Sequence, residues 1–179
     1  MTTFQILRLA MCVYAVLLVA VIYFTRATSH RVFGALSGAG AVALVGPGVE
    51  ALAHARGWWR YPSVDTPFGP LLIYPLVVLV FAILALIGWR VTRRFGGRGL
   101  AVFLAALVVM GTLRDLAVGA WFPQFFILAP GLEPRLADAA CWLGPTALAL
   151  AVMRLVSGPA GGDRLARRAR DAHSAADVQ

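Results

Sequence analysis

Long runs of apolar residues dominate the chain, and short polar segments separate them. Five such runs, each of about 18 to 24 residues, cover roughly positions 4–25, 32–53, 68–89, 100–122 and 137–156. A helix of about 20 apolar residues crosses the ~30 Å hydrocarbon core of a bilayer. The pattern therefore predicts an all-α integral membrane protein, a single bundle of about five transmembrane helices.

The composition agrees with a membrane protein. Of the 179 residues, 60% are hydrophobic, and the mean hydropathy is +0.80. The first run is too long for the apolar core of a secretory signal, and no small-residue cleavage site closes it, which favours a retained helix. We expect residues 1–156 to form the helical bundle. Residues 157–179, rich in Gly, Ala, Arg and Asp, are expected to form a basic, disordered cytoplasmic tail.

The positive charge is distributed unevenly about these runs. All 16 basic residues are arginines, and the formal net charge is +8. With five spans, one side of the membrane receives eleven of them: Arg26, Arg31, Arg90, Arg93, Arg94, Arg98, Arg154, Arg164, Arg167, Arg168 and Arg170. The other side receives Arg8, Arg56, Arg60 and Arg135, while Arg114 lies within the fourth run.

This arginine bias predicts the orientation of the chain. The positive-inside rule places the amino terminus outside and the carboxyl terminus in the cytoplasm, in a bacterial plasma membrane. Contact of the basic tail with anionic membrane lipid is expected. No folded nucleic-acid recognition module accompanies the charge, so a nucleic-acid partner is not expected.

The absence of certain residue types and motifs from the sequence excludes several enzyme classes. The chain contains no lysine, which excludes a retinal Schiff base and the lysine of a P-loop. Cys12 and Cys141 lie in different runs without a CxxC pattern, and we interpret both as packing residues. His54 is the one histidine near the membrane, so no metal site is expected. No G-x-G-x-x-G motif is present, and no cofactor is expected.

Two acidic residues lie inside apolar runs. Glu50 follows the Gly-Pro-Gly of the second run, and Asp115 lies in the fourth. Glu50 precedes Trp58 by about two helical turns and Asp115 precedes Trp121 by slightly less, so both carboxyls reach a similar depth if Trp marks the interface. A carboxyl facing lipid costs at least ~2.5 kcal/mol. Both acids are therefore expected to face the interior of the bundle in its outer half.

Small and helix-breaking residues accompany these acids. Gly111, Asp115 and Gly119 recur every four residues, so one helix face lets a neighbour or a ligand approach the acid closely. Pro47 is expected to kink the second helix one turn before Glu50. Further prolines flank Tyr74 and follow Trp142: these are Pro70, Pro75 and Pro145. Helix breaks beside polar side chains usually line a cavity, which is the structure predicted here.

The segment from the second run into the third resembles a known family. The stretches VEALAHARGWWRYP and PFGPLLIYP are similar to the membrane carotenoid-biosynthesis group, which includes carotenoid hydratases and small integral-membrane lycopene and terpenoid cyclases. The matching positions, within residues 46–122, are Glu50, Gly57, Trp59, Tyr61, Gly69, Pro70, Pro75 and Asp115. The family's usual Phe-Gly before the Tyr is replaced by Trp58, Trp59 and Arg60.

The resemblance implies an enzyme that protonates an alkene of an isoprenoid or other apolar, lipid-like substrate. An alkene is a weak base, so the proton must come from a carboxyl group that a low-dielectric pocket keeps neutral. Glu50 or Asp115 would donate the proton and the other would assist. Capture of the cation by a second alkene gives cyclisation, and capture by water gives hydration. The candidates for contacting the substrate are Trp58, Trp59, Tyr61, Tyr74, Trp121, Trp142, His54 and Arg114.

Each candidate also has a structural interpretation. Arg114 can form a structural ion pair with Glu50 or Asp115. The tryptophans can belong to the aromatic belt at the membrane surface, and His54 can be an interfacial residue. In the loops, Asp65 is interpreted as a turn or cap residue, and Glu133 is expected to pair with Arg135 in water.

The alternative function is a non-catalytic membrane protein: a transporter subunit, a lipid-binding protein or an assembly partner. The two functions predict different geometries. An apolar cavity shared by Glu50 and Asp115 favours the enzyme, whereas neutralisation of both acids by Arg114 in a packed interface favours the structural protein.

Overall fold

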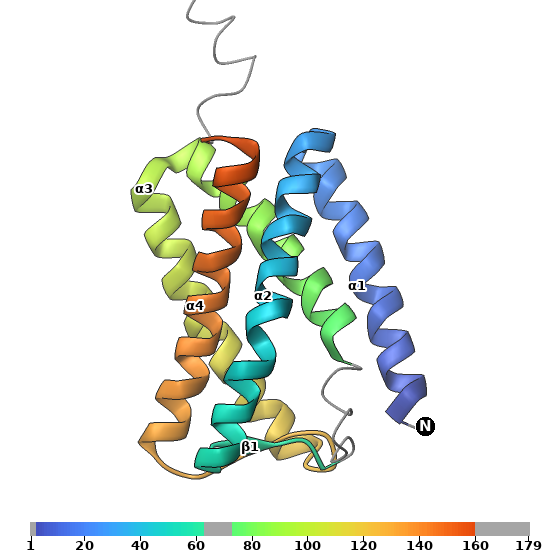
Figure 1. The fold of residues 1–179 in the computed structure, drawn as a ribbon, viewed down its shortest axis with the longest axis vertical. Coiled ribbons are helices and arrows are strands. Elements are labelled where there is room, and N and C mark those ends of the chain that lie inside the picture. The colour runs from blue at the N-terminus through green and yellow to red at the C-terminus, as the bar shows by residue number, and fades with distance from the viewer. Residues whose placement is uncertain (1–2, 63–72, 160–179) are drawn as a thin grey trace, which may run out of the picture.

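A computed structural model describes residues 3–62 and 73–159, and long helices make up nearly all of this part (Figure 1). The elements in chain order are α1 (Thr3–Thr25), α2 (Ser29–Arg56), β1 (Trp59–Arg60), α3 (Tyr74–Trp121), β2 (Ile127–Leu128) and α4 (Leu132–Ser157). All four helices of the described residues are long and apolar enough to cross a membrane. The predicted all-α architecture is confirmed, with one short two-stranded ribbon added.

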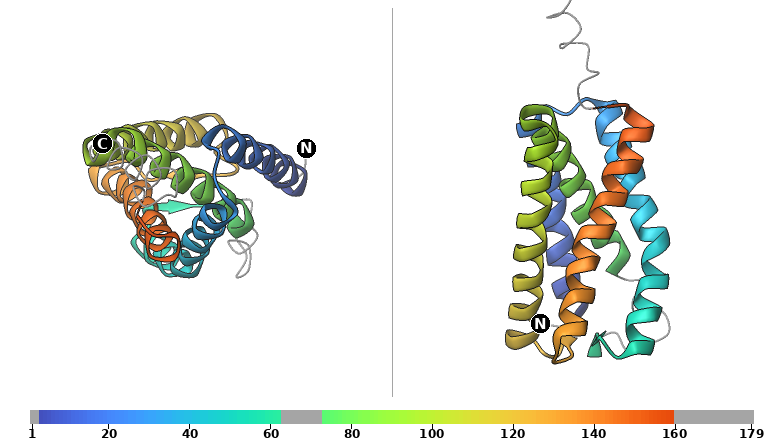
Figure 2. Two further views of the ribbon diagram at one scale, coloured as in Figure 1. Left: turned by 90° about the horizontal axis from the view of Figure 1, so that it is seen from above. Right: turned by 90° about the vertical axis from the view of Figure 1, so that its left-hand side faces the viewer.

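Helix α3 is bent back on itself at Gly96. Gly96 has φ 66° and ψ −158°, outside the helical region, and it interrupts an element that is otherwise helical from Tyr74 to Trp121. A positive φ is a conformation that glycine adopts without steric penalty. Figures 1 and 2 show the first arm rising to one end of the bundle and the second arm returning toward the other end. The runs predicted at 68–89 and 100–122 correspond to these two arms, except that positions 68–72 lie outside the described residues.

Glycines bring α2 and α4 close together. A methyl group added to Gly38 would collide with the backbone carbonyl of Ala149, and one added to Gly34 would collide with the Ser157 side chain. Small residues at such a contact let helix backbones approach closely, which strengthens van der Waals packing inside a membrane. The buried core then forms around α2, α3 and α4, with Leu86 and Met153 among its most buried side chains.

Helix α1 lies at the periphery of the bundle. It packs against α3, and its partly buried Leu18, Val21 and Ile22 reach the core. The view from above in Figure 2 shows α1 projecting away from the other helices. Large apolar side chains such as Val16 and Val19 are exposed on it, as expected for a surface that faces lipid.

Contrary to the prediction from the sequence, the prolines do not interrupt the described helices. Helix α4 continues through Pro145, and Pro75 lies in the first turn of α3, where a missing N–H group breaks no helical hydrogen bond. The predicted breaks at these two residues are therefore wrong. Pro47 lies inside α2, which runs as one helix to Arg56. Asp65, Gly69 and Pro70 lie outside the described residues.

The close contact of α2 with α4 gives a stability prediction. Gly38→Ala should destabilise the protein by roughly 1 to 3 kcal/mol, because the new methyl group has to displace the Ala149 backbone. Gly40 is the matched control, since nothing lies within 4 Å of a methyl group placed there. Gly40→Ala should leave stability unchanged or raise it by up to about 1 kcal/mol. Thermal unfolding of the purified variants in detergent measures both, and equal midpoints for Gly38→Ala and the wild type would contradict this packing.

Candidate functional site

A tight turn at the end of α2 folds the chain back toward Glu50. Gly57 ends the helix in the left-handed region, with φ 65°, and the Trp58 N–H donates to the Ala53 carbonyl at 2.9 Å. This is a common helix-terminating motif that glycine favours. The next residues form β1, which pairs antiparallel with β2 so that Trp59 lies opposite Leu128. The ribbon lies at one end of the bundle (Figure 1), and its Trp59 side chain is buried against Ala53 and Phe126.

Glu50 accepts hydrogen bonds through both carboxylate oxygens. The Trp59 Nε1–H donates to Oε2 at 2.9 Å, and the Tyr61 hydroxyl donates to Oε1 at 3.3 Å. Both donors come from the segment that the Gly57 turn redirects. Burial, and after it the negative charge of Glu50 and then of Asp115, raises the pKa of Tyr61 well above its ordinary value. Tyr61 therefore remains a hydroxyl donor across the physiological pH range.

Asp115 lies where the second arm of α3 meets α4. The Trp142 Nε1–H donates to its Oδ2 at 2.8 Å. The Trp142 ring lies directly against Gly111, one helical turn from Asp115, where a side chain would leave no room for it. The small-residue face predicted from Gly111 and Asp115 therefore receives an aromatic neighbour, and that neighbour binds the acid.

Arg114 interacts with one of the two predicted acids. Its Nε lies 3.7 Å from Asp115 Oδ1, and its guanidinium lies 5.4 Å from the centre of the Trp142 ring. The Arg114 side chain is 53% exposed, whereas that of Asp115 is 16% exposed. Glu50 has its own donors in Trp59 and Tyr61. Neutralisation of both acids by Arg114, which the structural interpretation predicts, is not what the described residues show.

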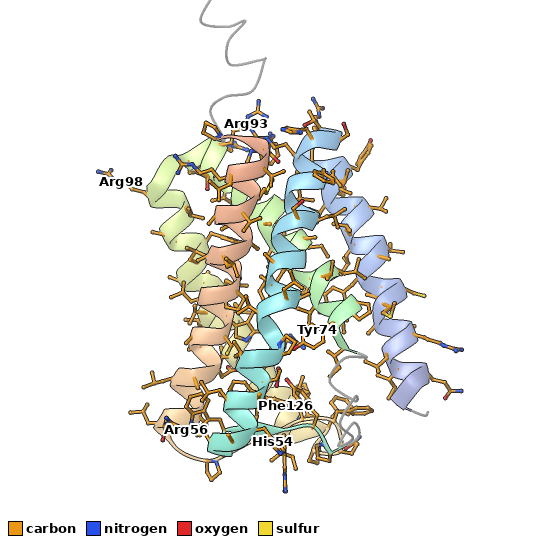
Figure 3. All side chains as sticks on the ribbon, in the orientation of Figure 1. His54, Arg56, Tyr74, Arg93, Arg98 and Phe126 are labelled. Carbon is orange, nitrogen blue, oxygen red and sulfur yellow. The ribbon has the colours of Figure 1, made fainter. Side chains whose placement is uncertain are left out.

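Glu50 and Asp115 share two neighbours in the bundle. Both carboxyls act electrostatically on Tyr61, and both act on Cys141 of α4. Glu50 also acts on Tyr74, whose buried hydroxyl has no hydrogen-bond partner among the described residues. Figure 3 places the labelled Tyr74 and Phe126 in the half of the bundle that the ribbon closes, away from Arg93 and Arg98. Cys141, interpreted from the sequence as a packing residue, thus borders the acids.

A third carboxyl, that of Asp138 in α4, lies near Glu50 and Asp115. The sequence-based prediction did not include it among the candidate site residues. Asp138 is 5% exposed, and it interacts electrostatically with Asp115 and Arg114. Its Oδ2 atom is buried without a hydrogen-bond partner among the described residues. Asp138 shares a helix face with Cys141 and Trp142, at spacings of three and four residues. That spacing is the sequence feature that could have identified Asp138 as a site residue. We call Glu50, Asp115 and Asp138 the carboxyl cluster.

Three predicted substrate contacts lie outside the carboxyl cluster. Trp121 is 76% exposed at the end of α3, and His54 is exposed on α2. Trp58 donates through Nε1 to Glu133 at 2.9 Å, at the surface of the molecule. Glu133 also lies 3.7 Å from Arg56, so its partner is Arg56 where the sequence predicts Arg135. These positions suit interfacial residues.

The carboxyl cluster combines proton-carrying groups with aromatic rings. Trp59, Tyr61 and Trp142 contact its acids directly, and aromatic faces stabilise cations. The described residues contain no group of three or more His, Cys, Asp or Glu side chains arranged to hold a metal ion. An open surface depression lined by Ile22, Tyr23, Phe24 and Arg26 lies at the carboxyl-terminal end of α1.

No family model, curated protein or solved structure matches this chain. The geometry of the carboxyl cluster is therefore the basis for a proposed function.

Proposed function

We propose that the protein is an integral membrane enzyme that protonates an alkene of an isoprenoid or similar apolar substrate. The observation that carries this proposal is the convergence of three carboxyls from three helices, α2, α3 and α4, beside the aromatic side chains that bind two of them. Carboxyls inside a membrane bundle are costly and are usually functional. The resemblance of residues 46–122 to carotenoid hydratases and membrane cyclases supports the same chemistry.

In the proposed reaction, carboxyls and aromatic rings perform different steps. A neutral carboxyl transfers its proton to one alkene carbon, and the other alkene carbon becomes a tertiary cation. The rings of Trp59 and Trp142 stabilise that cation through their faces without attacking it. A second carboxylate stabilises the charge or removes a proton at the end of the reaction. Cyclisation results if another alkene captures the cation, and hydration results if water does.

The proposed enzyme lies in the membrane with five crossings. Each arm of α3 is longer than roughly 30 Å at ~1.5 Å per residue, which is enough to cross the hydrocarbon core. The turn at Gly96 is flanked by Arg90, Arg93, Arg94 and Arg98. Arg31 and Arg93 both lie over the Trp89 ring, and Arg154 lies in the last turn of α4, whose end Arg31 contacts. We place this end in the cytoplasm, together with the basic tail, and the carboxyl cluster in the outer half.

A non-catalytic role is the second candidate, and one observation favours it. Both oxygens of Glu50 and one oxygen of Asp115 accept hydrogen bonds from the chain itself, and Arg114 lies beside the remaining oxygen. Such a network can fix helix ends without performing any reaction. In that case removing a carboxyl lowers stability and changes no lipid of the membrane.

Reporter fusions test the orientation. A reporter fused after Gln179, and one inserted at Gly97, should both be active in the cytoplasm, because the arginine-rich end faces that side. A reporter inserted at Gln124, between α3 and β2, should be active outside. Location of the termini on the same side of the membrane would contradict the five crossings.

Amide substitutions test the two acids that the sequence identifies. Glu50→Gln and Asp115→Asn should each slow turnover by roughly 100-fold, because each removes a carboxyl that donates the proton or stabilises the cation. Protein yield in the membrane should stay close to that of the wild type, since the amide oxygen still accepts the tryptophan hydrogen bond. Mass spectrometry of lipid extracts from isoprenoid-producing cells, with and without the protein, supplies the measurement.

Glu133→Gln is the matched control for these acid variants. It removes a carboxyl at the same end of the bundle, but that carboxyl is exposed and contacts Arg56 and Trp58. Its lipid profile should equal that of the wild type. If Glu50→Gln and Asp115→Asn also retain the wild-type profile, the acids take no part in turnover.

Leucine substitutions separate pocket tryptophans from belt tryptophans. Trp59→Leu and Trp142→Leu should change the ratio of products, because each removes a cation contact worth roughly 1 to 2 kcal/mol and lets the intermediate react by another route. Trp121→Leu is the control, since Trp121 is exposed at the end of α3. Product ratios are compared by chromatography. Lower expression of all three variants with unchanged ratios would assign these residues to the belt.

A further inference from the structure

Asp138 differs from the other two members of the carboxyl cluster in how it is bound. Glu50 and Asp115 each accept hydrogen bonds from aromatic donors. Asp138 is the one acidic residue that is buried among the described residues, and its Oδ2 has no partner there. Its polar neighbours are the Thr112 hydroxyl, whose oxygen is likewise buried, and the Asp115 carboxyl. A buried polar atom without a hydrogen bond is rare and calls for a functional explanation.

The helix register places Asp138 opposite Asp115. The second arm of α3 and α4 run in opposite directions, as the colour sequence in Figure 1 shows. Gly111 of α3 lies against Trp142 of α4. Asp115 lies one turn after Gly111 in α3, and Asp138 lies one turn before Trp142 in α4. The two carboxyls therefore face each other across this contact, and they interact electrostatically.

The surroundings of each acid indicate where a proton resides. Asp115 has the Trp142 N–H on one oxygen and the Arg114 guanidinium beside the other, so both of its oxygens are engaged within the chain. Both oxygens of Glu50 likewise accept hydrogen bonds, from Trp59 and Tyr61. Asp138 is buried, faces a second carboxyl and has the Thr112 hydroxyl as its nearby donor. Two facing carboxyls in a site of low polarity do not readily both ionise, and Asp138 is the one with an oxygen left free, so we assign the proton to Asp138.

We propose that Asp138 is the carboxylic acid that protonates the substrate alkene, with Asp115 and Glu50 acting as carboxylates. This proposal rests on the proposed function and names the proton donor within it. The O–H bond of Asp138 breaks, and the π electrons of the alkene form the new C–H bond. Asp138 is left as a carboxylate and the substrate as a tertiary cation.

The cycle closes without an oxidant or a reductant. In cyclisation, the ring-closed cation loses a proton, and that proton returns through Asp115 to Asp138, which lies opposite. In hydration, water adds to the cation and then releases the proton that Asp138 lost. Protonation of a trisubstituted alkene yields a tertiary cation, which aromatic rings stabilise.

Isotope labelling tests the donor role directly. Turnover in D2O should place one deuterium on the product carbon that is protonated. Asp115→Asn and Glu50→Gln should be slowed but should still make labelled product. Asp138→Asn should lose turnover by 100-fold or more, about the contribution of a general acid, whereas Asp138→Glu, which keeps an acid, should recover part of it. Turnover of Asp138→Asn at the wild-type rate would overturn the role of Asp138 and leave the proposed function standing, whereas absence of any isoprenoid product from the wild type would overturn the proposed function.

Infrared spectroscopy tests the position of the proton without any substrate. The wild-type protein, labelled with ¹³C on its aspartate carboxyls, should show the C=O stretch of a protonated aspartic acid that shifts in D2O. Asp115→Asn should keep this band, and Asp138→Asn should lose it. Loss of the band in Asp115→Asn, or its absence from the wild type, would overturn the proposal even if Asp138→Asn fails to fold.

Discussion

Carboxyl groups in the apolar part of a helical bundle depend on hydrogen-bond donors from the chain itself. This requirement determines the structure at the end of the bundle where β1 and β2 lie. An unsatisfied polar group in hydrocarbon costs several kcal/mol, so most polar groups of a membrane helix lie where other segments supply partners. Glu50 obtains its donors from Trp59 and Tyr61 because Gly57 turns the chain back under the helix that carries the acid. The β1–β2 ribbon then fixes the position of Trp59. Local backbone geometry and the acid's hydrogen bonds thus depend on each other.

The helical content was predictable because apolar runs of this length have few other structures available in a bilayer. The connection of the third and fourth runs was harder to predict. Polar residues at 90–98 indicate an end of the membrane segment, but hydropathy does not show that a single residue, Gly96, makes the reversal while helix continues on both sides. The ribbon was missed for a similar reason, since two strands of two residues each have no periodicity to detect.

The candidate site was predictable in part. Glu50 and Asp115 were found because a charge inside an apolar run is a strong signal, and their common depth followed from helix rise and tryptophan positions. Asp138 lies only six residues after Leu132, where α4 begins, so its position resembles that of a loop acid at the membrane surface. Its burial depends on the partner helix, which one sequence does not specify. The tryptophans show the same limit, because pocket and belt residues have the same composition and differ only in the direction they face.

The opposite end of the bundle determines whether the acids meet. Arg31 of α2 is 3% exposed and donates to the carbonyls of Gly158 and Pro159 at 2.6 and 2.9 Å, and the Ser157 hydroxyl donates to the His30 carbonyl. These bonds satisfy carbonyls beyond the last turn of α4 and fix its level relative to α2. Because a helix is rigid along its axis, a register fixed at Arg31 and at the glycine contact also fixes the heights of Glu50 and Asp138 at the far end. The arginine-rich end thereby supports the geometry of the acidic end, although no residue of one end touches a carboxyl of the other among the contacts described.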